Sequence, residues 1–211
     1  MAADPTGGGA GPWWPLLLVF LAGYLAGSVP SGLVLTRWAG LGDIRKIGSG
    51  NIGATNVLRT GRKGLALATL LFDLAKGALP TFLAYRWLGA DAAVAAGAGA
   101  ILGHCFPAWL GFKGGKGVAT AAGVILGFTP GVLGVLFLVF AGVVAATRYV
   151  SLASVLVAAL APVVAWLLGE STQAVWLFLL VGALVVVKHR ANIGRLLAGQ
   201  ESKVSFGGAK G

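Results

Sequence analysis

Long apolar stretches separated by short polar ones dominate this chain. The apolar segments fall at about 13–36, 65–85, 92–110, 118–128, 131–147, 150–168 and 173–187. A helix needs about 20 apolar residues to cross the hydrocarbon core of a bilayer, and most of these segments approach that length. The pattern predicts an all-α, polytopic membrane protein with seven transmembrane helices, some of them short or broken.

The weakest point of this prediction is the segment 118–128, which has about half the length of a span. The dipeptide Thr129-Pro130 follows it, with Gly127 and Gly131 on either side, and such a cluster is a strong helix breaker. An alternative interpretation joins 118–147 into one long kinked helix, which leaves six spans.

The basic residues decide between seven and six spans. With seven spans and the N-terminus outside, 14 of the 16 Lys and Arg residues share one side of the membrane, the exceptions being Arg86 and Lys76. With six spans, Arg148 and every later basic residue would change sides. Because cytoplasmic loops carry an excess of Lys and Arg, we expect seven spans, an outside N-terminus and a cytoplasmic C-terminus. Residues 1–12 are expected to form a mobile tail, 13–203 a single transmembrane domain and 204–211 a flexible tail.

Composition supports a membrane protein and limits its chemistry. Hydrophobic residues make up 57% of the chain and charged residues 10%, against roughly 25% charged in a soluble domain. The net charge of +10 comes from loops between spans, so it does not indicate nucleic-acid binding. The 35 glycines allow helices to approach closely. No histidine pair or carboxylate cluster suggests a metal, and we expect neither a metal nor a cofactor.

Seven spans place three polar segments, 43–64, 103–117 and 188–203, on the same face. In the second of them, Gly114, Gly115 and Gly117 surround Lys116 and follow Lys113. Glycines let consecutive backbone N–H groups turn toward one point, and such a nest binds anions. The lysines add full positive charge, so the segment predicts a phosphate site where water meets lipid.

The first polar segment is rich in small hydrogen-bonding side chains. Its candidate phosphate ligands are Gly48, Ser49, Gly50, Asn51 and Asn56. Arg45 and Arg59 bracket these positions, and each guanidinium can hold a phosphate with two parallel N–H bonds. Loops rich in Gly, Ser and Asn are often only turns, and that alternative stays open.

Histidines and buried charges are the remaining candidates. His104 begins the second segment, either as a ligand or bonded to a carbonyl at a helix end. In the third segment, His189 and Asn192 share a helical face, although the segment also fits a helix end whose basic side chains reach the interface. Asp73 and Lys76 lie within the second span, three residues apart, so they can pair with each other.

Familiar catalytic motifs are absent. A nucleotide-binding loop has Ser or Thr directly after its Lys, whereas Lys116 is followed by Gly117 and Val118. Neither His104 nor His189 begins a His-x₄-Asp motif. No Gly-x-Ser-x-Gly elbow occurs.

Three long motifs occur in order: GSGNIGATNVLR at 48–59, GHCFPAWLGFKGGKGVAT at 103–120 and HRANIGRLLAGQESK at 189–203. Together they resemble the acyl-phosphate:glycerol-3-phosphate acyltransferases of bacterial membranes, and the resemblance covers about 16–203. One departure is Ala191, where such proteins often carry an acid. Residues that match the positions assigned to catalysis and substrate binding are Ser49, Arg59, Lys116, His189 and Asn192.

The resemblance implies a bacterial inner-membrane enzyme with seven spans. We expect its active site to face the cytoplasm, the monomer to be active and no cofactor to be needed. The resemblance also implies transfer of an acyl group from acyl phosphate to the 1-hydroxyl of glycerol 3-phosphate, which yields lysophosphatidic acid and phosphate. The resemblance suggests that the donor's own phosphate takes the hydroxyl proton, and the lack of an evident protein base is consistent with this route; His189 is the alternative. A transporter of phosphate or a phosphate ester is the competing function, although the basic motifs crowd one face and leave no matching site on the other.

Overall fold

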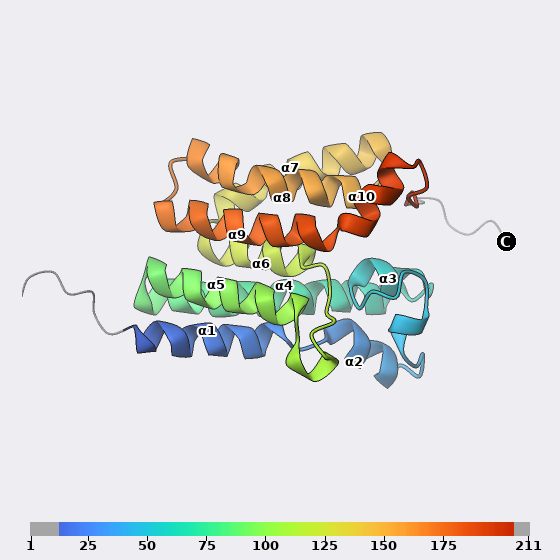
Figure 1. The fold of residues 1–211 in the computed structure, drawn as a ribbon, viewed down its shortest axis with the longest axis horizontal. Helices are drawn as coiled ribbons and strands as arrows, with labels where there is room; N and C mark the ends of the chain where they lie inside the picture. The colour runs from blue at the N-terminus through green and yellow to red at the C-terminus, as the bar shows by residue number, and fades with distance from the viewer. Residues whose placement is uncertain (1–12, 205–211) are drawn as a thin grey trace, which may run out of the picture.

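The computed structural model describes residues 13–204, and the elements in that range are all helices, which confirms the predicted all-α class. Seven of them run side by side (Figure 1): α1 Trp14–Gly27, α4 Lys63–Leu88, α5 Ala90–Cys105, α6 Val118–Phe128, α7 Pro130–Thr147, α8 Val150–Leu167 and α9 Thr172–Lys188. Shorter elements lie toward one end: α2 Ser31–Trp38, η1 Ile44–Lys46, α3 Ala54–Leu58, η2 Ala108–Leu110 and α10 Arg190–Leu197. The predicted tail 1–12 and residues 205–211 lie outside the described part.

The described helices include 5 candidates that are long and apolar enough to cross a membrane, counting α1 with α2 as one, or 6 if the bent pair α9 and α10 forms one span. The apolar helix α6 is too short to qualify by itself. The molecule is therefore a polytopic membrane protein, while the count of seven spans and the sidedness of the termini stay predictions.

The first apolar segment, predicted at 13–36, forms one candidate span, Trp14–Trp38, which is broken into two helices. Helix α1 ends at Gly27 and α2 begins at Ser31, because Pro30 has no N–H to donate and disfavours a helical conformation at Val29. The carbonyls near this break find partners elsewhere: Trp109 Nε1 donates to Ser28 O at 2.7 Å, and Lys76 Nζ donates to Val29 O at 2.8 Å.

Glycines permit the closest helix contacts. Helices α1 and α5 pack so tightly that a Cβ on Gly27 would overlap the carbonyl oxygen of Ala100, and one on Gly103 would overlap that of Tyr24. Between α4 and α6, a Cβ on Gly77 would overlap the carbonyl oxygen of Thr120. Small residues at such crossings let backbones approach in a membrane, which accounts for much of the glycine content.

The predicted break after residue 128 is present. Helix α6 ends at Phe128, Thr129 is extended, and Pro130 is the first residue of α7, a position where proline is well tolerated. Figure 1 shows α7 starting at the end of the bundle where α6 stops and running back along it. The alternative of one long kinked helix over 118–147 is therefore wrong.

The three polar segments meet at one end of the bundle. Figure 1 shows α3 with its preceding loop, the loop between α5 and α6, and α10 at the same end. Residues from 43–64, 103–117 and 188–203 are thus brought together from distant parts of the sequence, as the distribution of basic residues predicted.

Candidate active site

The loop before α3 is organised by one buried amide. Asn56 is 2% exposed, and its Nδ2 donates to the carbonyls of Ile44, Ile47 and Asn51 at 3.1, 2.9 and 2.8 Å. Its Oδ1 accepts from both the backbone N and the Oγ of Ser49, at 2.9 and 3.1 Å. The structure thus uses Asn56 to shape the loop and leaves Ser49 exposed at its surface.

The two arginines that bracket this loop have different surroundings. Arg45 forms a bidentate pair with Asp43, with Nε–Oδ1 at 2.9 Å and Nη2–Oδ2 at 2.6 Å, and its hydrogen bond holds the pKa of Asp43 well below the usual range. Arg59 is exposed at the end of α3 and lies over Gly48, whose φ of 56° suits glycine. The guanidinium of Arg59 has no salt-bridge partner within residues 13–204.

Two amides of the glycine-rich loop are bonded within the protein, and the predicted anion nest stays a prediction. Gly114 N donates to Cys105 O at 3.2 Å, and Gly115 N donates to His104 O at 3.0 Å. The physical reason is that a chain reversal next to apolar helices must bond its own backbone groups. Within residues 13–204, the backbone N–H groups of Lys116 and of the first three residues of α6 donate to no backbone carbonyl.

The lack of side chains at these glycines has another use. A Cβ on Gly114 would overlap the carbonyl oxygen of His104, and one on Gly115 would overlap Nε2 of the His104 ring. His104 is 4% exposed, so it lies beneath the loop. The loop ends at Gly117, whose φ of 86° suits glycine. Of the two lysines in the loop, Lys113 is exposed and Lys116 is half-buried, so Lys116 is the one that the loop directs inward.

Lys116 is joined to the third segment by a chain of hydrogen bonds. Lys116 Nζ donates to Asn192 Oδ1 at 2.5 Å, and Asn192 Nδ2 donates to Glu201 Oε1 at 2.6 Å. The other oxygen of Glu201 accepts from Arg195 Nε at 2.6 Å. Burial lowers the pKa of Lys116; the Glu201 carboxylate opposes this effect, while the positive charges of Arg195 and Arg59 add to it.

Glu201 is a site residue that sequence reasoning missed. Its side chain is only 7% exposed. Burial alone would raise its pKa, but hydrogen bonds from Asn192, Ser151 and Arg195 outweigh burial and lower it. The segment that carries it folds back on the α7–α8 turn, where Val204 N donates to Arg148 O at 2.8 Å.

His189 stands at the bend between α9 and α10, which are inclined by 59°. Its ring is buried, and Nδ1 lies 2.8 Å from Val185 O. A carbonyl can only accept, so Nδ1 carries the hydrogen and Nε2 of the neutral ring is an acceptor. Beside it, Lys188 Nζ donates to Cys105 O at 2.8 Å and lies 4.4 Å from the centre of the Phe106 ring, which ties the third segment to the second.

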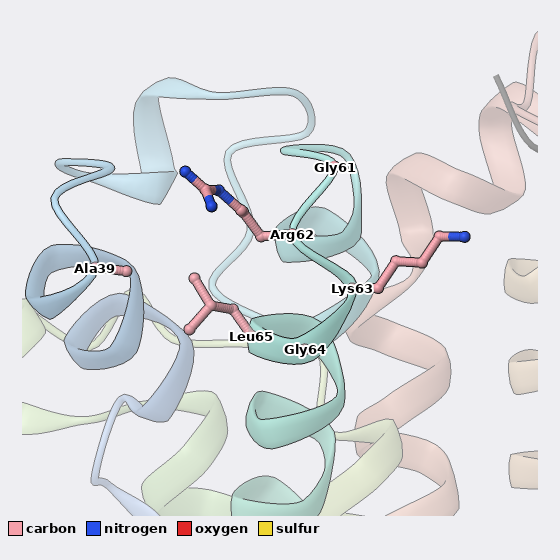
Figure 2. A pocket seen from close by; sticks show the side chains of 6 residues that line it. All are labelled: Ala39, Gly61, Arg62, Lys63, Gly64 and Leu65. Atoms are coloured by element: carbon pink, nitrogen blue, oxygen red, sulfur yellow. The ribbon is translucent and has the colours of Figure 1, made fainter.

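Two further features belong to this end of the molecule. Ser151 is buried in the first turn of α8, and its hydroxyl lies close enough to Glu201 to help lower the pKa of that carboxyl. A surface hollow of about 560 Å³ lies between Ala39 and the start of α4. Figure 2 shows Arg62 rising beside this hollow while Lys63 points to the other side. None of the predicted site residues lines the hollow.

Comparison with known proteins identifies the family of this chain. The family model described as glycerol-3-phosphate acyltransferase matches residues 17–199. The chain belongs to this family. It is an acyltransferase embedded in a membrane, so the transport alternative is not retained.

Two relatives span nearly the same length. The chain is 54% identical over 192 residues to a glycerol-3-phosphate acyltransferase of Methylorubrum extorquens (strain PA1), covering 90% of this chain and 94% of the relative. It is 53% identical over 196 residues to one of Mesorhizobium japonicum, covering 93% and 98%.

Two solved structures share the fold. PlsY (YgiH), an integral membrane glycerol 3-phosphate acyltransferase, matches in its glycerol 3-phosphate form with a TM-score of 0.86 and 38% identity, covering 90% of this chain and 96% of that one. Its lysophosphatidic acid form matches with a TM-score of 0.85 and 37% identity, over the same shares of the two chains.

Proposed function

We propose that this acyltransferase moves a fatty acyl group from acyl phosphate to the 1-hydroxyl of glycerol 3-phosphate, giving 1-acyl-glycerol 3-phosphate (lysophosphatidic acid) and phosphate. The observation that carries the proposal is the half-buried Lys116, which is held by Asn192 at the same end of the bundle as the Arg59 loop. The glycerol 3-phosphate and lysophosphatidic acid forms of the similar PlsY structure agree with this substrate and product.

The charges at this end suit two phosphate groups held side by side. Glu201 is matched by Arg195, so Lys116 and Arg59 remain as positive charges without a carboxylate of their own. Fixed donors aimed at a charge that grows in the transition state are usually the largest catalytic term. We assign Lys116 to the leaving phosphate and the exposed loop of Ser49 and Arg59 to the second phosphate. Arg45 can join them only by giving up its pair with Asp43.

The chemistry needs no covalent acyl-enzyme, since acyl phosphate is already activated. The 1-hydroxyl oxygen forms a bond to the acyl carbon, and the bond from that carbon to the bridging phosphate oxygen breaks. The hydroxyl proton passes to a phosphate oxygen of the donor, which leaves as phosphate. His189 Nε2, an acceptor in the neutral ring, orients the hydroxyl, and Asn192 keeps Lys116 in place.

The test of this function uses purified protein in detergent with acyl phosphate and radiolabelled glycerol 3-phosphate. Formation of labelled lysophosphatidic acid, with one phosphate released per product, is the expected result. Acyl-CoA as the only donor is the control and should give no product. Product from acyl-CoA, or none from acyl phosphate, would contradict the proposal.

The proposal includes a bacterial cytoplasmic (inner) membrane location, with the site facing the cytoplasm and the monomer as the active form. The orientation of the site rests on the excess of basic residues on one side of the predicted membrane. Cysteines introduced at Lys46 and Glu170, in a Cys105→Ser background, should react with an impermeant reagent from opposite sides of the membrane. Labelling of both from the same side would contradict the topology.

A further inference from the structure

A buried polar cluster lies below the glycine-rich loop, within the helix bundle. Asp73 and Lys76 of α4 pair at 2.7 Å, with side chains 4% and 8% exposed, which confirms the predicted pairing. Charged groups inside a membrane protein are costly and are commonly functional or paired. Pairing explains how these two are tolerated, but it does not explain why the bundle contains them.

The cluster is connected to the break between α1 and α2. Ser31, the first residue of α2, donates its Oγ hydrogen to Asp73 Oδ1 at 2.5 Å. Lys76 Nζ also donates to Val29 O at 2.8 Å. The pair therefore fixes the irregular backbone at Pro30 relative to α4.

On its other side, the cluster faces His104. Nδ1 of His104 lies 3.7 Å from Asp73 Oδ1 and has no hydrogen-bond partner among the described residues, although it is fully buried. The opposite edge of the ring, which carries Nε2, lies directly against Gly115. Lys116 is the next residue, so one ring separates the buried pair from the backbone of the catalytic lysine.

We propose that Asp73, Lys76 and His104 are positioning residues that set the backbone of Gly115 and, through it, the place of Lys116. The Asp73 carboxylate attracts the Nδ1–H of His104 and so fixes the ring, while Lys76 pairs with the same carboxylate and balances its charge. His104 supports the loop from below and does not contact substrate. The assignment rests on the proposed role of Lys116.

The experiment compares Asp73→Asn, Lys76→Met and the double variant with wild type. Each single change leaves one charge or polar group unmatched and should lower the thermal unfolding midpoint; the double variant should recover most of that loss, because a neutral pair is less costly than one buried charge. The double variant should still lose about 10- to 100-fold in kcat, the scale expected when a catalytic group is displaced. Thr81→Val, which alters another buried polar group of α4, is the control and should behave as wild type.

Two readouts separate positioning from a structural ion pair. In a Lys116→Met background the double variant should cause no further loss of kcat, since coupled residues act non-additively. Hydrogen exchange in residues 104–117 should be faster in the double variant than in wild type, and this measurement requires no substrate. A double variant with wild-type kcat, or an equal further loss in the Lys116→Met background, would overturn the inference. Absence of turnover in wild type would instead refute the proposed function, while the exchange result would stand.

Discussion

Glu201 offers the sharpest single test of the site, because it determines how Asn192 is oriented. The amide of Asn192 has one donor end and one acceptor end. Since Nδ2 faces Glu201 Oε1 at 2.6 Å, Oδ1 is directed to Lys116 Nζ. Glu201→Gln keeps the size of the side chain but replaces one of its two acceptor oxygens by an N–H donor.

The expected effect follows from the two bonds of 2.6 Å that the carboxylate accepts, one from Asn192 and one from Arg195. A glutamine can accept from only one of these donors, so one charge-assisted bond, worth about 1.5–3 kcal/mol, is lost. The carboxylate is only 7% exposed, so solvent does not replace the missing bond. If the whole loss raises the free energy of the transition state, kcat/KM falls by about 10- to 100-fold, because about 1.4 kcal/mol corresponds to a tenfold change in rate.

The assay is initial-rate formation of labelled product by Glu201→Gln across glycerol 3-phosphate concentrations, alongside the thermal midpoint. Ser202→Ala, a change at the exposed neighbouring position, controls for disturbance of the segment and should keep wild-type rates. Glu201→Gln with kcat/KM within twofold of wild type would show that Lys116 and Asn192 keep their geometry without the carboxylate, and the reasoning would be wrong.

Three further predictions concern the charge, the base and the packing. The pKa of Lys116 is lowered from its ordinary 10.5, so kcat/KM should decline with rising pH at a pH below 10.5, as the lysine loses its proton. Lys116→Arg should move this decline to higher pH, since guanidinium stays charged. A decline at an unchanged pH would assign it to another group. His189→Gln should keep kcat within about tenfold of wild type if the ring only orients the hydroxyl, whereas loss of a general base typically costs 10²–10⁴-fold. Gly99→Leu should lower the thermal midpoint strongly because a Cβ there overlaps α1, while Gly134→Leu, in open space, should not; equal midpoints would contradict the packing account.

Much of the architecture could be predicted because membrane insertion constrains it through simple variables. Apolar length located the helices, and the side bias of Lys and Arg placed the three polar segments at one end, as Figure 1 shows. The break at Thr129-Pro130 was visible as well, since proline and glycine act locally. The break at Pro30 was missed because its cost is offset by distant partners, Lys76 and Trp109, which no local pattern reveals.

The site was predictable in its residue types but not in its connections. Lys116 and Asn192 were both candidates, yet they are 76 positions apart in sequence and their contact depends on the fold. Gly115 was proposed as a phosphate ligand, and the structure adds a requirement that no sequence pattern reveals: its amide is bonded to a carbonyl, and the position needs room for the His104 ring. Glu201 was missed because an isolated acid near the C-terminus resembles an ordinary surface residue until its burial is known.

The order of the hydrogen-bonded groups that run from Lys116 through Asn192 to Glu201 has a chemical consequence. A carboxylate in direct contact with Lys116 would form an ion pair that an incoming phosphate would have to break. Here a neutral amide, Asn192, lies between Lys116 and Glu201, so the carboxylate fixes the amide without neutralising the lysine at close range. Arg195 in turn balances Glu201. The lysine is therefore oriented by a charge that does not compete for it, which is the state an anion-binding catalytic group needs before its substrate arrives.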